Sequence, residues 1–367
     1  MKNFDEEFMR RAFTLAERGR GFVSPNPLVG AVIVKNGKIL AEGWHEKYGG
    51  HHAERAAILK LAGKRPVKNC ARGATIYVSL EPCAHHGRTP PCTDIIIEAG
   101  IKKVVFAVRD PNPQVRKLDP ARILKKAGLE VVYPVLEQEA RELNKVFFKN
   151  QTRGLPYITL KSAVTLDGKI ADARGRSKWL TGAGARAEVQ KLRLTHDAVL
   201  VGKNTVLQDN PRLNIRLPGI KKENYKIVLG ARGQFPSSTK LLKDPQAIFT
   251  AERDLKKLLT ELYQKYQICS VLVEGGAAVN TSFLQSGLAD EWQLFIAPKI
   301  LGGGALPVVG DLGINKLSEF YHAKIHSVQK IGEDVLLSCH FNIRQRQGGR
   351  AIQRATPTKW SSGTKPQ

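Results

Sequence analysis

The sequence predicts an α/β protein built of two successive units. Segments with strand character alternate with segments of helical periodicity in both halves of the chain, a pattern typical of a mainly parallel sheet covered by helices on both faces. The alternation restarts after a turn-forming stretch near residue 151. A chain of 367 residues is also longer than one ordinary compact domain. We therefore expect one α/β domain over residues 1–150 and a second over 151–343.

The first domain is expected to open with an amphipathic helix, because Phe4, Phe8, Ala12 and Leu15 fall on one helical face. Strands and helices then alternate, and Gly100 is expected to end one of the helices. The predicted strands are 29–34, 74–80, 104–108 and 129–133, and the predicted helices are 53–62, 93–99, 121–127 and 138–150.

The second domain begins after the turn signal QTRGLP at 151–156. Its first strand is predicted at 157–164, and further strands are predicted at 196–202, 225–230 and 270–276. The last segment, 344–367, is rich in Gly, Ser, Thr, Pro and Gln and carries basic residues without acidic ones. Such a composition buries little apolar surface, so we expect a basic, disordered tail.

The composition favours a soluble protein of a reducing compartment. The longest apolar run, 28–34, is far shorter than the ~20 residues that span a bilayer. The charged N-terminal segment lacks the apolar core of a signal peptide. Five scattered cysteines are too few for a disulfide framework. We therefore expect a cytoplasmic protein with no membrane partner.

The formal net charge of +25 invites a nucleic-acid partner, but its distribution argues against one. Six of the basic residues lie in the tail, and the others form no run of five or more. We interpret them as a solvated surface with a bias toward phosphorylated small molecules.

Two short segments bring together residue types that bind and use zinc. His52 and Glu54 stand two residues apart at the start of a predicted helix, and Cys83 and Cys92 follow the next predicted strand. Three nitrogen and sulfur ligands leave the fourth tetrahedral position for water, which is typical of a catalytic zinc. Glu54, which is not a ligand, can move protons from that water to the ring and to the leaving ammonia. The pattern predicts hydrolytic deamination of a nucleobase-like ring.

The same pattern leaves alternatives open. Spacing alone does not exclude His51 as the ligand, and His52 is preferred because it stands in the H-A-E triplet. Two cysteines around a histidine pair could also form a structural zinc knuckle, although a knuckle has no use for Glu54. The zinc-deaminase signature has two residues between its cysteines, whereas this chain has eight. We expect this longer loop, with His85 and Arg88, to form a wall of the substrate site.

With these motifs the chain resembles the bifunctional deaminase-reductases of riboflavin biosynthesis. Matching stretches are SPNPLVGAVIV, GGHHAE, LEPCAHHGRTPPC and RDPNP in the first half, and LKSAVTLDGKIA, VGKNTVLQDNPRL, LVEGGA and IAPKILGG in the second. The resemblance covers about residues 5–342. It implies an N-terminal cytidine-deaminase-like α-β-α sandwich and a C-terminal dihydrofolate-reductase-like α/β domain. It also implies Zn²⁺ and NADPH as cofactors, and it is compatible with a homo-oligomer.

For the first half, the resemblance implies that His52, Cys83 and Cys92 bind zinc and that Glu54 is the catalytic proton shuttle. It further implies a pocket for the pyrimidine and its ribose phosphate. The pocket residues would be Asn26, His45, His85, Arg88, Asp110 and Asn112. Their chemistry is suitable, because an amide can pair with a ring edge and a guanidinium offers a fixed cationic fork to phosphate.

For the second half, the strand-Gly-Gly-helix order in SVLVEGGAAVN allows the backbone to approach a phosphate at a helix N-terminus. It is not the three-glycine dinucleotide fingerprint. By resemblance, the NADPH contacts would be Ala163, Trp179, Thr205, Asp209, Gly276, Ala277, Ala278, Val279, Asn280, Thr281 and Ser282. The substrate contacts would be Ser177, Arg193, Leu213, Arg216 and Glu274. Arg193 could instead be a surface charge on its helix.

These observations predict two consecutive reactions. The first is deamination of 2,5-diamino-6-(5-phosphoribosylamino)pyrimidin-4(3H)-one, and the second is NADPH-dependent reduction of the ribosyl group to a ribityl chain. The alternatives are a deaminase of bases in tRNA or single strands, with a structural second domain, or a chain in which one half is only structural. The stretch 229–236 departs from the family pattern, because Gly230 and Ala231 stand where aspartate and serine are usual.

Overall fold

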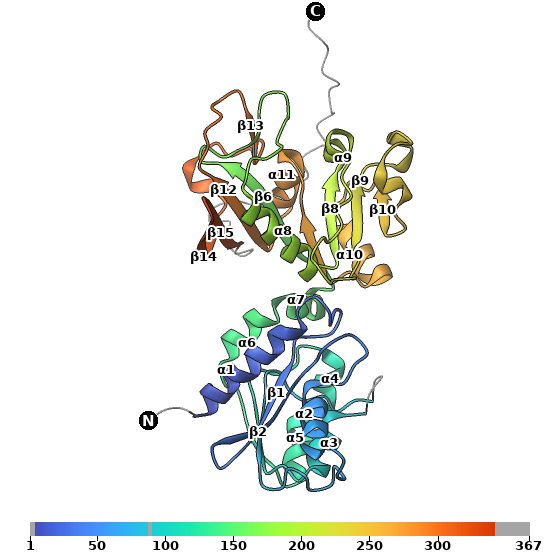
Figure 1. Ribbon diagram of the computed structural model, residues 1–367, viewed down its shortest axis with the longest axis vertical. Coiled ribbons are helices and arrows are strands. Elements are labelled where there is room, and N and C mark those ends of the chain that lie inside the picture. The colour runs from blue at the N-terminus through green and yellow to red at the C-terminus, as the bar shows by residue number, and fades with distance from the viewer. Residues whose placement is uncertain (1–3, 87–89, 342–367) are drawn as a thin grey trace, which may run out of the picture.

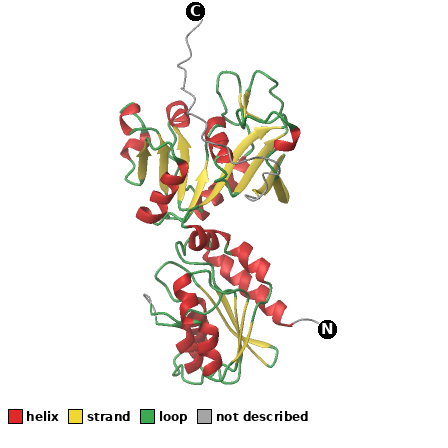
Figure 2. Cartoon of the chain, turned by 180° about the vertical axis from the view of Figure 1, so that it is seen from behind, coloured by secondary structure: helices red, strands yellow, loops and turns green. Residues whose placement is uncertain are grey.

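The computed structural model describes residues 4–86 and 90–341, so the tail expected at 344–367 lies outside the described residues. Two α/β units lie end to end along the long axis of the molecule, and helix α7 (Lys145–Arg153) lies where they meet (Figure 1). Each unit has its own main sheet, which Figure 2 shows from behind. In the described part of the chain, no helix is long and apolar enough to cross a membrane.

The first unit contains a five-stranded sheet of order β2-β1-β3-β4-β5. Its strands are β1 (Gly30–Lys35), β2 (Lys38–Trp44), β3 (Thr75–Val78), β4 (Lys103–Phe106) and β5 (Glu130–Val132). The pairs β3/β4 and β4/β5 are parallel, whereas β1 pairs antiparallel with both β2 and β3. The expected mainly parallel arrangement is therefore wrong at this end of the sheet.

The physical reason is a tight hairpin between β1 and β2. Asn36 and Gly37 both take positive φ, at 51° and 73°. A two-residue hairpin turn with positive φ at both positions strongly favours the Asn-Gly dipeptide. This turn reverses the chain at once, so no crossover helix separates the two strands.

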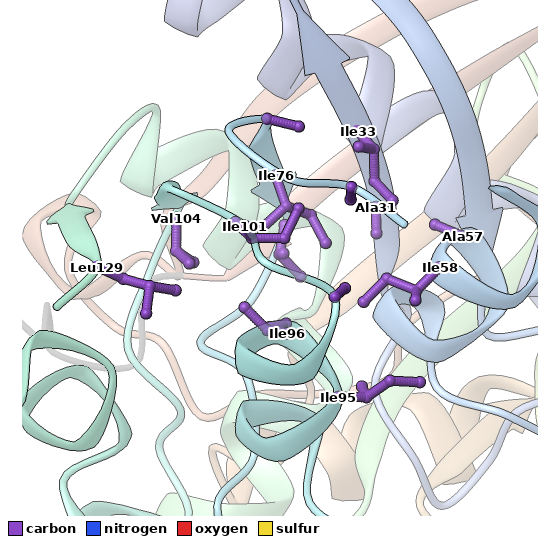
Figure 3. Close-up of a cluster of buried hydrophobic side chains, with 14 of the residues drawn as sticks. Ala31, Ile33, Ala57, Ile58, Ile76, Ile95, Ile96, Ile101, Val104 and Leu129 are labelled. Carbon is purple, nitrogen blue, oxygen red and sulfur yellow. The ribbon is translucent and has the colours of Figure 1, made fainter. Parts of the chain in front are cut away.

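Helices cover both faces of the first sheet. They are α1 (Phe4–Ala16), α2 (Ala53–Ala62), α3 (Cys92–Glu98), α4 (Pro113–Leu118), α5 (Pro120–Lys126), α6 (Glu137–Leu143) and α7. Ile58 of α2 and Ile96 of α3 are buried in one cluster with Ile76 of β3 (Figure 3). Burial of such a side chain contributes roughly 1.5–3 kcal/mol, so this cluster anchors α2 and α3, whose N-termini carry the predicted zinc ligands.

On the opposite face, Met9 and Leu15 of α1 pack against the sheet, while Phe4 at the helix start is 61% exposed. The helix expected at 138–150 is divided into α6 and α7 at Asn144. The buried Asn144 amide pairs with both backbone groups of Leu28, donating to its carbonyl at 2.9 Å and accepting from its N–H at 2.8 Å. These two hydrogen bonds satisfy the buried amide of Asn144 at the point where α6 ends and α7 begins.

The second unit contains an eight-stranded sheet of order β10-β9-β8-β11-β6-β12-β15-β14. Its strands are β6 (Tyr157–Thr165), β8 (Ala198–Gly202), β9 (Tyr225–Leu229), β10 (Ala247–Thr250), β11 (Ser270–Val273), β12 (Glu291–Ala297), β14 (Ala323–Ile331) and β15 (Asp334–Phe341). The strands from β10 to β12 in this order are parallel, and β12/β15 and β15/β14 are antiparallel. A separate small ribbon pairs β7 (Lys169–Ala171) with β13 (Leu306–Pro307).

The main helices of this unit are α8 (Ala183–Thr195), α9 (Lys203–Asp209), α10 (Leu255–Tyr266) and α11 (Ala277–Gln285). Leu258 of α10 and Phe283 of α11 belong to one buried cluster with Val271 of β11. Val206 of α9 belongs to another cluster, on the other face of the sheet, with Val201. All four strands predicted in the second unit are present, whereas the antiparallel strands β14 and β15 were not predicted.

Candidate active sites

The predicted zinc ligands converge at one edge of the first sheet. His52 is the N-cap of α2, Cys83 follows β3, and Cys92 is the first residue of α3. The His52 Nδ1 atom lies 3.4 Å from Cys83 Sγ and 3.3 Å from Cys92 Sγ. Ligands bound to one tetrahedral zinc at about 2.0–2.3 Å stand roughly 3.5 Å apart, so the three residues fit the metal. Within the described residues, they form the one cluster of this kind.

The ambiguity between the two adjacent histidines is resolved by their positions. The His51 side chain is exposed, and its carbonyl lies 2.9 Å from His45 Nδ1. His52 is half-buried and in contact with both cysteine sulfurs. The preference for His52 is confirmed.

The electrostatic setting suits proton transfer. Glu54, in the first turn of α2, is 3% exposed, and burial raises the pKa of its carboxyl to about 7. A carboxyl near its pKa at neutral pH can both accept and return a proton. The hydrogen bond with the Cys92 thiol lowers the pKa of Cys83 to about 4, which favours the thiolate that a metal requires.

A cavity of about 550 Å³ opens above this cluster. His52, Glu54 and Cys83 line it, together with most of the predicted pocket residues. Those residues are Asn26, His45, His85, Asp110 and Asn112. Arg88, the sixth predicted residue, lies outside the described part of the chain. The structure thus brings together every member of this predicted set that it describes.

Hydrogen bonds fix the orientation of Asn26. The His51 carbonyl can only accept, so His45 Nδ1 carries the proton and donates to it at 2.9 Å. In a neutral ring the other nitrogen is then an acceptor, and Asn26 Nδ2 donates to His45 Nε2 at 3.0 Å. Burial lowers the pKa of His45, in agreement with a neutral ring. The Asn26 side-chain oxygen remains to accept a hydrogen bond from a ligand.

Other polar groups around the cavity are poised for a ligand. The buried Nδ1 atom of His85 has no hydrogen-bond partner among the described residues. Burial raises the pKa of Asp110 to about 6, and its Oδ1 accepts from the Asn112 N–H at 2.8 Å. Asn112 in turn caps α4 by accepting from the Gln114 N–H. These positions are held by local hydrogen bonds before any ligand binds.

Sequence reasoning missed several lining residues. Glu81 is buried next to the cysteine loop, and its Oε2 accepts from the Asp110 N–H at 3.2 Å. Its Oε1 makes no hydrogen bond among the described residues and lies 3.9 Å from Arg109 Nε. Its position in LEPC, two residues before Cys83, could have drawn attention to it. Another group comes from the second unit and had no sequence signal. That group is Tyr263, Gln264, Gln267 and Cys269.

In the second unit, two glycine-led helices start at the carboxyl ends of neighbouring parallel strands. Gly202 is the N-cap of α9 after β8, and Gly276 is the N-cap of α11 after β11, each without a side-chain cap. Free backbone N–H groups at a helix N-terminus suit a phosphate. A Cβ atom at Gly202 or Gly275 would meet Val279 side-chain atoms at 2.8 or 2.5 Å. Because Gly202 and Gly275 have no side chain, Val279 can pack closely against both the start of α9 and the start of α11.

The other predicted NADPH contacts are distributed around this edge. Residues 277–282 form the first turns of α11, Thr205 and Asp209 lie on α9, and Ala163 lies in β6. Asn280 is fully buried and donates to Ser162 and to a backbone carbonyl, but its Oδ1 has no partner. Trp179 is 69% exposed in a loop, with Arg186 over its ring.

Two of the predicted substrate residues of this unit, Arg193 and Glu274, form an ion pair. Arg193 is only 8% exposed and binds Glu274 through two prongs, so it is not a surface charge. Arg216 and Ser177 are exposed, whereas the Leu213 side chain is buried in a hydrophobic cluster. Sequence reasoning missed Lys161, whose pKa is lowered by burial and which lies close to Arg193 and Glu274.

Comparison with known proteins places both units in one family. Residues 156–337 match the family described as RibD C-terminal domain, and residues 2–108 match the cytidine and deoxycytidylate deaminase zinc-binding region. The chain is 44% identical to the riboflavin biosynthesis protein RibD of Actinobacillus pleuropneumoniae, over 91% of this chain and 94% of the relative. It is 42% identical to that of Aquifex aeolicus, over 92% and 98%.

Solved structures agree with this placement over nearly the whole chain. The Acinetobacter baumannii RibD structure, form 1, superposes with a TM-score of 0.85 at 39% identity and covers 92% of this chain and 99% of that one. A Thermotoga maritima structure gives a TM-score of 0.83, also at 39% identity, with the same coverage. That protein is named a diaminohydroxyphosphoribosylaminopyrimidine deaminase and 5-amino-6-(5-phosphoribosylamino)uracil reductase. The fold is thus a cytidine-deaminase-like domain followed by a dihydrofolate-reductase-like domain, and the chain belongs to the RibD family of bifunctional, zinc-dependent deaminase-reductases of riboflavin biosynthesis.

Proposed function

We propose that the first unit deaminates 2,5-diamino-6-(5-phosphoribosylamino)pyrimidin-4(3H)-one and that the second reduces the resulting 5-amino-6-(5-phosphoribosylamino)uracil with NADPH. The observation that carries the first step is Glu54 beside the His52, Cys83 and Cys92 cluster at the cavity. A volume of about 550 Å³ lies within the range of small-molecule sites. The activity named for the Thermotoga maritima relative supports the choice of substrate.

In the deaminase, His52, Cys83 and Cys92 would hold zinc, which supplies a Lewis acid that acidifies a water molecule. Glu54 would pass one proton of that water to the ring nitrogen as its oxygen adds to the ring carbon, and the second proton, from the added hydroxyl, to the leaving amine. Water and the amino compound thus give the ring carbonyl and ammonia. Asn26, fixed by His45, accepts a hydrogen bond from the pyrimidine, while His85, Arg88, Asp110 and Asn112 bind its edge and its ribose phosphate.

In the reductase, NADPH supplies a hydride to the first carbon of the opened sugar. We assign the cofactor phosphates to the N-terminus of α11, with further contacts from Ala163, Trp179, Thr205 and Asp209. We assign the substrate to Ser177, Arg193, Leu213, Arg216 and Glu274. Because the Arg193 guanidinium is already paired with Glu274, the exposed Arg216 is the better partner for the 5′-phosphate.

We further propose a deaminase domain over 1–150 and a reductase domain over 151–343, joined through α7. The family matches, which end at 108 and begin at 156, support this division. The presence of five free thiols supports a reducing compartment such as the cytoplasm. Exposed Ile325 and Val328 on the edge strand β14 support a homo-oligomer formed through this edge. Light scattering of wild type and Val328→Glu tests the last point.

One preparation tests the two-step proposal. Ammonia release from the diaminopyrimidinone should depend on zinc and stop with a chelator. NADPH oxidation with the deaminated intermediate should continue in the same chelator. The nucleic-acid alternative would be favoured instead by tight, salt-sensitive RNA binding without turnover of the free nucleotide.

A further inference from the structure

The deaminase cavity has a wall that belongs to the reductase unit. Tyr263 and Gln264 at the end of α10, and Gln267 and Cys269 after it, line the same cavity as Glu54. Figure 1 shows α10 on the side of the second unit that faces the first. These residues precede β11, so they lie at the opposite end of that strand from Glu274, which follows β11. The wall is therefore separate from the reductase site.

One half-buried carboxylate, that of Asp197, holds this wall against the first unit. Asp197 Oδ2 accepts from the Ser24 hydroxyl at 2.9 Å, and it also accepts from the Cys269 N–H at 2.9 Å and the Ser270 N–H at 3.1 Å. Ser24 immediately precedes Pro25, Asn26 and Pro27, which line the cavity. The Asn150 amide of α7 donates to the Cys269 carbonyl at 3.0 Å. The two walls of the cavity are thus fixed relative to each other by direct hydrogen bonds.

The chemistry of the wall suits a sugar phosphate. Among the described residues that line the cavity, there is no lysine or arginine. The second unit contributes neutral donors to this cavity, namely the Tyr263 hydroxyl and the Gln264 and Gln267 amides. Both glutamine side chains are exposed, and neither they nor the Tyr263 hydroxyl has a hydrogen-bond partner in the described structure. Amides and a phenol provide both donors and acceptors for ribose hydroxyls, and donors for phosphate oxygens.

The backbone at Gln267 gives an independent indication. Gln267 takes φ of +54° just after α10, a left-handed position that favours glycine or asparagine. Four of the eight non-glycine residues with positive φ in the described chain are Asn or Asp, and Gln267 is not among them. The chain therefore has a long glutamine side chain at a backbone position that favours glycine or a short side chain. Such outliers are typical of functional positions.

We propose that the end of α10 completes the deaminase site, with Gln264, Gln267 and Tyr263 adding neutral hydrogen bonds to the ribosyl phosphate of the substrate, beside the contacts proposed above from the first unit, while the pyrimidine lies at the zinc cluster. The inference rests on the proposed function, since it requires a substrate with a sugar phosphate. It makes the reductase domain a determinant of deaminase specificity, in addition to its own reaction.

Substitution at Gln267 tests this proposal in the full-length enzyme. Gln267→Gly removes the amide and relieves the left-handed backbone, so the melting temperature should stay equal or rise while the deaminase KM rises about tenfold with kcat nearly unchanged. Gln267→Asn keeps a shorter amide in a tolerated conformation and should restore part of the affinity. The double variant Gln264→Ala with Gln267→Gly should raise KM further. NADPH oxidation on the deaminated intermediate should keep its wild-type kinetics in all three.

Lys265→Ala is the matched control, because Lys265 is exposed on the same end of α10 and does not line the cavity. Its deaminase KM should equal that of wild type. An unchanged KM in Gln267→Gly and in the double variant, with an active wild type, would overturn this inference and leave the proposed function intact. If wild type itself releases no ammonia from the phosphoribosylamino substrate, the proposed function fails instead.

Discussion

Arg193 and Glu274 form a buried, two-pronged ion pair, with Nε–Oε1 and Nη2–Oε2 distances of 2.7 and 2.9 Å. The pair connects the last turn of α8 to the residue that follows β11. Arg193 also donates to the Asn214 carbonyl at 3.0 Å, so its donors are largely used inside the protein. We propose that Arg193, besides the substrate contact assigned above, positions Glu274 and the loop at Asn214.

Breaking this pair should destabilise the second unit. Arg193→Ala removes both hydrogen bonds from the Glu274 carboxylate and leaves only the nearby Lys161 and Arg216 charges, so we expect a loss of about 3 kcal/mol in the free energy of unfolding. Arg193→Lys should recover part of this, because lysine cannot form the two-pronged contact. Urea unfolding followed by fluorescence measures both. Equal stability of wild type and Arg193→Ala would contradict the importance of the pair.

The same pair predicts a dependence on pH. Burial alone would raise the pKa of Glu274, but Arg193 holds it below its ordinary value. A lowered folded-state pKa contributes stability above the unfolded value of about 4.3, and this contribution disappears as pH falls through the folded value. The stability difference between wild type and Glu274→Gln should therefore shrink below about pH 4.3. A difference that grows with acidification would contradict this assignment.

Adding one methyl group at Gly275 should weaken NADPH binding. The new Cβ of Gly275→Ala would meet Val279 at 2.5 Å and displace the first turn of α11. We expect the KM for NADPH to rise at least about tenfold, because helix N-terminal N–H groups lose their alignment with phosphate. Gly233→Ala is the control, since a Cβ at Gly233 meets nothing within 4 Å. An unaffected KM in Gly275→Ala would argue against phosphate binding at this helix.

The protonation state of His45 should determine how the KM of the deaminase changes at acid pH. Burial lowers the pKa of His45 below its ordinary value of about 6.5, so its Nε2 still accepts from Asn26 at pH 6.5. Below the folded pKa, Nε2 becomes a donor, the contact with Asn26 is lost, and KM should rise. We expect Asn26→Ala to have a high KM that no longer changes over this range. An acid rise of equal size in Asn26→Ala would show that the two residues are not coupled.

Short motifs made the zinc centre predictable from sequence. His52 and Cys92 each stand at the start of a helix, and Cys83 lies in the loop between β3 and α3, so local sequence decides much of the geometry. The two hydrogen bonds between the Asn144 side chain and the Leu28 backbone join segments far apart in the chain. The helical periodicity of 138–150 therefore gave no sign that the helix is interrupted there. By contrast, the Asn36-Gly37 turn was a local signal for the β1/β2 hairpin that the strand-helix alternation obscured.

Contacts between segments far apart in the chain could not be predicted from the sequence. The pairing of Arg193 with Glu274 and the position of Gln267 at the deaminase cavity join residues far apart in the chain. Exposed edge strands such as β14 lack the alternation of buried and exposed residues on which strand prediction depends. Family resemblance named both sites, but it did not reveal that one domain contributes to the cavity of the other.

The adjacent histidines allow a direct test of the zinc ligand. His52→Ala should purify with almost no bound metal and release no ammonia, because it removes one of three ligands. His51→Ala should retain about one zinc per chain, since that side chain is exposed. Atomic absorption on matched preparations measures both. Loss of zinc from His51→Ala with retention in His52→Ala would reverse the assignment.

The central claim is that one chain holds two chemically independent sites, with Glu54 serving only the first. Glu54→Gln keeps the size of the buried side chain but removes the proton-transfer group beside the zinc ligands. The decisive measurement is ammonia release and NADPH oxidation by this one variant, the second assayed on the already deaminated intermediate. In Glu54→Gln we expect ammonia release to fall at least about a thousandfold, while NADPH oxidation stays within about twofold of wild type. Loss of both activities in a folded, zinc-loaded Glu54→Gln protein would contradict it.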